Sequence, residues 1–187
     1  MDGFFYYFAY GSNMLTARLQ APSRCKSAEP VGVAEAKDFS VAFNKPSKDG
    51  SGKAALTSKI GSRAYGVVFK IHDTELPALD RAEGEGRGYK RCDKFSVRLT
   101  NAERLLDLKT YLATETDSAR EPYDWYLALV IAGAREHNIA NEYLKGLYEI
   151  PYCVDECLNR PERKEAIEAL EKSGYSDFRV VLSTPAI

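Results

Sequence analysis

The sequence is poor in the features that would assign it to a membrane, to a secretory route or to nucleic acid. No apolar run approaches the ~20 residues of a membrane span, and the opening Met1-Asp2-Gly3 lacks the basic region of a secretory signal. Lys and Arg number 26 and Asp and Glu number 27, so no net positive charge attracts nucleic acid or an anionic membrane. We therefore expect a cytoplasmic protein whose partners include neither nucleic acid nor a membrane.

Cysteine and histidine are also scarce. The four cysteines are Cys25, Cys92, Cys153 and Cys157. They are too few and too irregularly spaced for a disulfide framework in 187 residues, so we expect free thiols. Cys153 and Cys157 could form half of a zinc site, but the two histidines, His72 and His137, lie far away in sequence. A structural metal is therefore only a minor alternative.

The composition itself, 44% hydrophobic and 28% charged, is that of an ordinary globular protein. Because no low-complexity linker divides the chain, we predict one domain over residues 1–187. Apolar alternation predicts strands at 31–45, 54–60, 63–71, 90–99 and 105–113, and with the opening strand these make six. Helices are expected at 122–137, 141–147 and 160–172. The expected fold class is α+β, with a mixed or antiparallel sheet that can close into a small barrel.

The opening stretch Tyr6–Met14 is a run of aromatic residues that ends on small polar ones. It predicts a strand buried on both faces, a tight turn at Gly11-Ser12-Asn13, and a helix over residues 14–19. Such a turn directs backbone N–H groups and a helix N-terminus at one spot, which suits a carboxylate, a phosphate or an oxyanion. The plain alternative is a buried strand followed by a Ser/Asn helix cap.

Residues 73–84 begin with capping residues, carry Pro77 near the first turn and end on Gly84, which predicts a short helix. Leu76 and Leu79 precede Glu83 by seven and four residues, so Glu83 shares their apolar face. Its carboxylate also lies in the last turn, where the helix dipole disfavours an anion. Glu83 is therefore the best candidate for an acid or base, and the alternative is a surface carboxylate.

Two loops flank these segments. The stretch Lys45–Gly52 has Asp-Gly turn chemistry and little to bury, and we interpret it as a solvated hairpin tip rather than a phosphate loop. Residues 84–89 carry three glycines, which allow the hydroxyl of Tyr89 to lie close to the end of the helix.

Four motifs in this order resemble the gamma-glutamylcyclotransferase family across roughly residues 5–147. They are Tyr7–Met14, the strand Tyr65-Gly66-Val67-Val68-Phe69, Leu79–Gly84 with Tyr89 beyond it, and Tyr126 with Gly133–His137. The resemblance implies an α+β fold built on a small β-barrel flanked by helices, no metal or organic cofactor, and often a homodimer. It implies conversion of a small-molecule γ-glutamyl amide into 5-oxoproline and a free amine.

The resemblance also assigns roles to residues. The catalytic acid/base falls on Glu83. The substrate-binding residues are Tyr7, Phe8, Ala9, Tyr10, Gly11, Ser12, Asn13, Tyr89 and Tyr126. Whether the turn Gly11-Ser12-Asn13 binds an oxyanion or the substrate α-carboxylate stays open. The resemblance does not extend over residues 150–187, whose role is also open.

Two other functions remain as alternatives. A catalytically silent binding module could keep the same fold, although such a relative would be free to lose Glu83. A serine amidase would use Ser12, but Gly11-Ser12-Asn13 is not a nucleophile elbow, and neither His72 nor His137 lies in a recognisable triad context.

Overall fold

The computed structural model describes residues 3–102 and 105–183. The strands are β1 (Phe4–Ala9), β2 (Glu29–Pro46), β3 (Gly52–His72), β4 (Tyr89–Leu99) and β5 (Leu105–Ala113). The α-helices are α1 (Thr16–Leu19), α2 (Leu76–Glu83), α3 (Asp124–Glu136), α4 (Asn141–Tyr148) and α5 (Pro161–Lys172). Short 3₁₀ helices are η1 (Ser12–Met14), η2 (Asp73–Glu75) and η3 (Phe178–Leu182).

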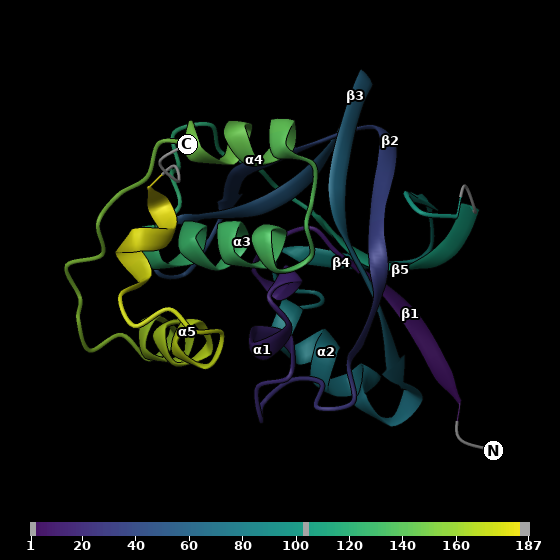
Figure 1. Cartoon of the computed structure of the whole chain (residues 1–187), viewed down its shortest axis with the longest axis horizontal. Coiled ribbons are helices and arrows are strands. Elements are labelled where there is room, and N and C mark those ends of the chain that lie inside the picture. Colours follow the sequence, from purple (N-terminus) through teal and green to yellow (C-terminus); the bar gives the residue numbers. More distant parts are fainter. Residues whose placement is uncertain (1–2, 103–104, 184–187) are drawn as a thin grey trace.

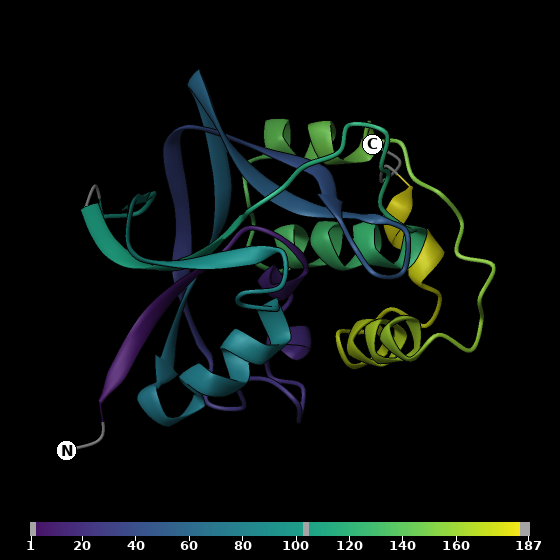
Figure 2. The same ribbon diagram turned by 180° about the vertical axis from the view of Figure 1, so that it is seen from behind.

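The strands close into a barrel in the order β1-β3-β2-β4-β5. Neighbouring strands are antiparallel except at the seam, where β1 meets β5 in parallel at Tyr7 and Lys109. Helices α3, α4 and α5 lie on one side of this barrel, and β1 begins on the other (Figure 1). Figure 2 shows the same arrangement from behind. The predicted α+β class with a small mixed barrel is confirmed.

The count of six strands is wrong, because the segments predicted at 54–60 and 63–71 form one strand, β3. Across the hairpin, Lys37 pairs with Arg63 and Phe39 pairs with Ser58, so residues 59–62 bulge out opposite Asp38. The Asp38 carboxylate accepts a 2.8 Å hydrogen bond from the Gly61 N–H in this bulge. A bulge interrupts the apolar alternation without ending the strand, which is why the sequence pattern divides in two.

The expectation that the opening strand is buried on both faces holds only for its second half. Phe4 and Tyr6 are 49% and 42% exposed, whereas Tyr7, Phe8 and Ala9 are buried. Side chains alternate across a strand, so Phe4, Tyr6 and Phe8 share one face. That face is covered only toward the end of β1, where Phe8 stacks on Phe95 with 6.0 Å between ring centroids.

Helix α3 is the central element of the helical layer. Every residue from Asp124 to Ala134 is buried, so the helix is enclosed on all sides rather than along the single stripe that the sequence indicated. A Cβ on Gly133 would lie 2.4 Å from the Leu15 backbone nitrogen. Glycine there lets α3 pack directly on the chain that follows the opening turn, so α3 sets the position of that turn.

The C-terminal segment, whose role the sequence left open, packs on the outer side of α3 through α5 and η3. Asp155 anchors it: its buried carboxylate accepts hydrogen bonds from Trp125 Nε1 at 2.9 Å and from Arg160 Nε at 2.7 Å. Within residues 3–102 and 105–183, none of the helices combines the length and apolar character that crossing a bilayer requires.

Candidate active site

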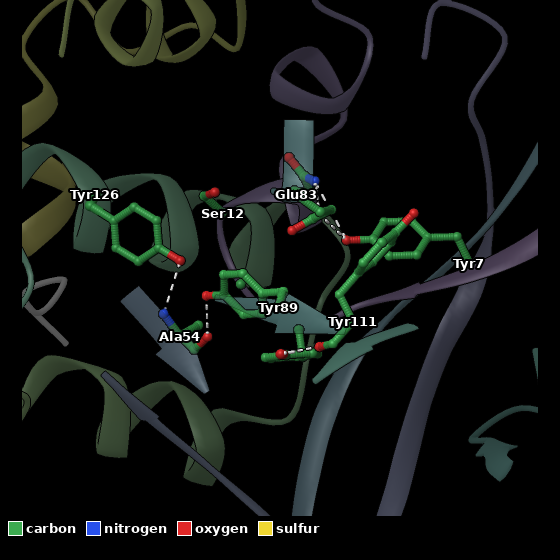
Figure 3. A pocket seen from close by; sticks show the side chains of 10 residues that line it. Tyr7, Ser12, Ala54, Glu83, Tyr89, Tyr111 and Tyr126 are labelled. Carbon is green, nitrogen blue, oxygen red and sulfur yellow. Dashed lines mark hydrogen bonds between the residues drawn. The ribbon is translucent and has the colours of Figure 1, made fainter. Parts of the chain in front are cut away.

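A narrow cavity of about 30 Å³ lies where the end of β1, the end of α2 and the start of α3 come together (Figure 3). It is lined by Tyr7, Tyr10, Gly11, Ser12, Asn13, Ala54, Glu83, Tyr89, Tyr111 and Tyr126. The lining therefore combines five tyrosines, one carboxylate and the backbone of the opening turn. A concave cluster of aromatic rings and convergent polar groups is typical of a site for a small polar molecule.

The end of α2 fixes the position of Glu83. Gly84 follows it in the left-handed conformation (φ 73°) and caps the helix, as its place in the sequence predicted. One turn earlier, the Asp80 carboxylate accepts two hydrogen bonds from Arg91 Nη1, at 2.6 and 2.8 Å, and one from the Tyr111 hydroxyl at 2.7 Å. These bonds tie the last turn of α2 to strands β4 and β5, so Glu83 is carried on a helix end that the barrel holds.

The Glu83 carboxylate is half-buried and lines the cavity, so the alternative of a surface carboxylate is wrong. Its Oε1 atom accepts hydrogen bonds from the Tyr7 hydroxyl at 2.6 Å and from Asn13 Nδ2 at 2.5 Å. Arg24 Nη1 donates to Asn13 Oδ1 at 3.1 Å, which fixes the orientation of the Asn13 amide. In the described part of the chain these donors all act on Oε1, and Oε2 is the oxygen left for a ligand.

The hydroxyls of Tyr10, Tyr89 and Tyr126 differ in whether each donates its proton to an acceptor within the protein. Tyr10 donates to the Tyr111 carbonyl at 2.5 Å and Tyr89 donates to the Ala54 carbonyl at 2.7 Å. The Tyr126 hydroxyl instead accepts from the Ala54 N–H at 3.1 Å, which leaves its own proton for another acceptor (Figure 3). Burial raises the pKa of Tyr126 to about 12, so this hydroxyl stays protonated at neutral pH.

The opening turn differs from the predicted strand, turn and helix. Residues 12–14 form a 3₁₀ turn, closed by a 3.0 Å hydrogen bond from Met14 N–H to the Gly11 carbonyl. Helix α1 then spans only Thr16–Leu19. A single turn of helix has too small a dipole to act as an anion site, so any anion binding there would rest on the backbone N–H groups of the turn.

The structure brings most of the predicted site residues together. Those that line the cavity are Tyr7, Tyr10, Gly11, Ser12, Asn13, Glu83, Tyr89 and Tyr126. Phe8 and Ala9 do not: both are fully buried in the core, because alternation turns their side chains away from the cavity or leaves them too short to reach it. Ala54 and Tyr111 were missed, and the one available signal was another tyrosine within the predicted strand 105–113.

The prediction of a solvated hairpin tip at Lys45–Gly52 is wrong for part of that loop. Lys45 and Ser51 are buried, and the Gly52 N–H donates to the Glu121 carbonyl at 2.7 Å. The Tyr123 hydroxyl donates to the Asp49 carbonyl at 3.0 Å. The loop thus folds back over the start of α3 and forms one side of a wider hollow of about 400 Å³ next to the cavity.

Two alternative chemistries find little support in this geometry. No histidine of the described residues lines the cavity, so the histidine base of a serine-histidine pair is missing beside Ser12. His137 lies instead against Thr16, with 3.1 Å between Nε2 and Oγ1. No group of three or more potential His, Cys, Asp or Glu ligands is found in residues 3–102 and 105–183.

Comparison with known proteins places this site in a family. The model of the AIG2-like family matches residues 63–147, which include Glu83 but not the opening turn. Gamma-glutamylcyclotransferase of Bos taurus is 32% identical over 151 residues, which cover 78% of each chain. The chain belongs to the gamma-glutamylcyclotransferase family. The gamma-glutamylcyclotransferase of Homo sapiens is 33% identical over the same share of both chains.

The fold of a gamma-glutamylcyclotransferase family member is seen in solved structures as well. A solved structure of a gamma-glutamyl cyclotransferase superposes with a TM-score of 0.79 at 29% identity, covering 89% of this chain and 99% of that one. The named relatives are enzymes, so family membership supports an enzyme of the cyclotransferase class in general.

Proposed function

We propose that this gamma-glutamylcyclotransferase relative converts a γ-glutamyl amide into 5-oxoproline and a free amine, with Glu83 as the acid and base. The observation that carries the proposal is the geometry of Glu83, whose Oε1 is fixed by Tyr7 and Asn13 on the wall of a cavity that the opening turn also lines. A carboxylate held in this way can exchange protons with a ligand without changing its own position.

The reaction needs no nucleophile from the protein. The α-amine of the γ-glutamyl group attacks its own γ-carbonyl carbon, a five-membered ring closes, and the amide C–N bond breaks to release the amine. Intramolecular attack gains effective molarities on the order of 10⁵ M or more when the reacting atoms are held in position. The aromatic walls from Tyr10, Tyr89 and Tyr126 supply a rigid, narrow space that favours the folded conformer of the substrate.

We assign to Glu83 the proton transfers from the attacking nitrogen and to the leaving nitrogen. The α-amine is mostly protonated at neutral pH, so it must lose a proton before it attacks, and the departing nitrogen must gain one. A single carboxylate does both when it first takes the proton from the attacking nitrogen and then gives it to the leaving nitrogen. Oε2 is the atom that would carry this proton, since Tyr7 and Asn13 hold Oε1.

The tetrahedral intermediate carries a negative oxygen, for which two donors are available. Gly11, Ser12 and Asn13 line the cavity and can offer their backbone N–H groups, and the Tyr126 hydroxyl retains a proton to donate. One of these donors would then be free to bind the substrate α-carboxylate.

The decisive test compares Glu83→Gln with the native protein, on a panel of γ-glutamyl amides with mass-spectrometric detection of 5-oxoproline. The native protein should release 5-oxoproline, whereas Glu83→Gln, which keeps one acceptor oxygen for Tyr7 and Asn13 and nearly the same size, should lose at least about 10³-fold in kcat with its thermal unfolding unchanged. Glu171→Gln, at an exposed position of α5, serves as the matched control and should be fully active.

The same panel tests the two alternatives. A silent binding module would release no 5-oxoproline from any amide. A serine amidase would lose activity in Ser12→Ala and would form a covalent adduct at Ser12, whereas the proposed reaction forms none.

A further inference from the structure

We propose that Lys53 is a positioning residue for the reaction, because it holds the Ala54 backbone to which two tyrosine hydroxyls of the cavity are bound. This inference rests on the proposed function, since its consequence is measured as turnover. It concerns the wall of the cavity and gives a role to a lysine that the sequence did not single out.

Ala54 is the point at which Tyr126 and Tyr89 are bound to the barrel. Its N–H donates to the Tyr126 hydroxyl at 3.1 Å, and its carbonyl accepts from the Tyr89 hydroxyl at 2.7 Å (Figure 3). The N–H belongs to the peptide that joins Lys53 to Ala54. The two hydroxyls therefore keep their places in the cavity only while the backbone at Lys53 and Ala54 keeps its orientation.

The sheet does not hold Ala54 by regular pairing. In the register between β2 and β3, the pairs on either side of it are Lys45 with Lys53 and Ala42 with Ala55, so two β2 residues lie opposite Ala54 alone. This is a β-bulge, in which the ladder is locally disrupted. The orientation of the Ala54 peptide therefore depends on what anchors the residues beside it.

Polar contacts anchor the Lys53 side chain. Its Nζ donates to Asp49 Oδ2 and to Ser51 Oγ, both at 2.8 Å. The side chains of Lys53 and Asp49 are only 15% and 8% exposed, so solvent ions screen this pair less than a surface pair. The Tyr123 hydroxyl in turn donates to the Asp49 carbonyl at 3.0 Å, which ties the partner of Lys53 to the start of α3.

Aromatic rings at the start of α3 surround the same ammonium group. Lys53 Nζ lies 4.5 Å from the centre of the Trp125 ring, 4.7 Å from that of Tyr126 and 5.8 Å from that of Tyr123. A cation within about 6 Å of a ring centre is attracted by the ring, more strongly where water is excluded. One ammonium group thus holds both sides of the hydrogen bond between Ala54 and Tyr126, the backbone that donates and the ring whose hydroxyl accepts.

Lys53 also lines the hollow next to the cavity, so direct contact with the substrate is the competing assignment. Two of the three N–H groups of its ammonium are already donated to Asp49 and Ser51. A substrate contact would act independently of the Tyr126 hydroxyl, and the losses from removing the two groups would multiply. A positioning residue acts through that hydroxyl, so most of its effect disappears once the hydroxyl is gone.

The experiment is a double-mutant cycle, measured as kcat/KM for 5-oxoproline release from a γ-glutamyl amide that the native protein turns over. Lys53→Met should lower kcat/KM by about tenfold, because small displacements of positioned groups reduce rates by up to about 10²-fold. In the Tyr126→Phe background the same change should cost less than about threefold. The two single variants should also alter the same parameter, kcat or KM.

Three further variants serve as controls, with thermal unfolding to show that each is folded. Lys53→Arg keeps a cation for Asp49 and the rings, and should recover most of the lost kcat/KM. Lys59→Met, at an exposed position of the same strand, removes the same charge and should be fully active. Asp49→Asn removes the partner of Lys53 and should show the same dependence on Tyr126 with a smaller loss, so it replaces Lys53→Met if that variant does not fold.

Three results would overturn the inference. One is a folded Lys53→Met protein with native kcat/KM. Another is an equal fold-loss from Lys53→Met in the native and Tyr126→Phe backgrounds, which would indicate an independent contact. The third is a change in KM alone in one single variant and in kcat alone in the other. Absence of 5-oxoproline with the native protein and every amide would instead contradict the proposed function itself.

Discussion

The Tyr7 hydroxyl donates a 2.6 Å hydrogen bond to Glu83 Oε1 across 76 residues of sequence. The bond joins the barrel seam to the end of α2, since Tyr7 is the residue of β1 that pairs with β5. Burial raises the pKa of Tyr7 well above its usual range, and the neighbouring Glu83 charge adds to this effect, so the tyrosine acts only as a donor.

Replacing this donor gives a direct prediction for turnover. Tyr7→Phe should lower kcat by about 10- to 100-fold with a smaller change in KM, because a hydrogen bond to a charged group contributes about 1.5–3 kcal/mol. The fold should remain, since the Phe ring keeps the edge contact with Tyr111. Steady-state kinetics would check this, with Tyr6→Phe, at an exposed neighbour on the same strand, as the control. Equal kcat and KM values in the two variants would show that the Tyr7–Glu83 hydrogen bond does not contribute to turnover.

The Asp80 network gives a prediction for stability. Asp80→Asn should lower the free energy of unfolding by about 1–3 kcal/mol, because a charge-assisted contact with Arg91 is lost and the Tyr111 hydroxyl keeps only a neutral acceptor. Activity should fall as well, since the last turn of α2 carries Glu83. Urea unfolding measures the first effect and 5-oxoproline release the second.

Asp93 provides the matched comparison for Asp80. It also pairs with Arg91, at 2.9 Å, but its side chain is 51% exposed. Asp93→Asn should therefore cost less than about 1 kcal/mol. If both variants lose the same stability, the partly buried network is not what holds α2 in place.

Asp49 gives a prediction for the pH dependence of stability. Burial favours a higher pKa for Asp49, but the Lys53 ammonium and hydrogen bonds from Lys53 and Ser51 outweigh it and lower the pKa to about 2. A carboxylate whose pKa is lower in the folded state stabilises the fold above its unfolded pKa of about 4, and this contribution disappears as the pH falls toward 2. Asp49→Asn should thus be about 2 kcal/mol less stable than the native protein at pH 6.

The measurement is urea unfolding of both proteins at several pH values. The difference between them should shrink from pH 4 downward and approach zero near pH 2. A difference that stays constant over this range would mean that the Asp49 carboxylate titrates normally in the folded protein.

The parts of the site that the sequence could predict are those with a strong local signal. Glu83 was found because two leucines at helical spacing and a terminal glycine define the helix that carries it. The turn at Gly11-Ser12-Asn13 was found because small polar residues follow an aromatic strand directly. In both places one short segment of sequence contains both the polar residues and the signals for the backbone conformation that positions them.

The remaining parts depend on which distant segments meet. Ala54 and Tyr111 reach the cavity only because the barrel places β3 and β5 beside β1. Lys45 is buried near the end of β2, where its Nζ lies 4.8 Å from the centre of the Tyr89 ring, and no local pattern indicates this distant contact. Phe8 and Ala9 were included because their motif is contiguous in sequence, whereas a strand presents only some of its residues to a cavity.

The barrel seam has a consequence for incomplete chains. Thr110 Oγ1 donates to the Phe8 carbonyl at 2.9 Å and Tyr10 donates to the Tyr111 carbonyl, so β5 secures the strand that precedes the opening turn. A growing polypeptide that ends before β5 already contains Tyr7, Asn13 and Glu83 but lacks the strand that closes around them. During synthesis, before β5 is made, the chain would thus hold the Glu83 carboxylate without the enclosure that β5 completes.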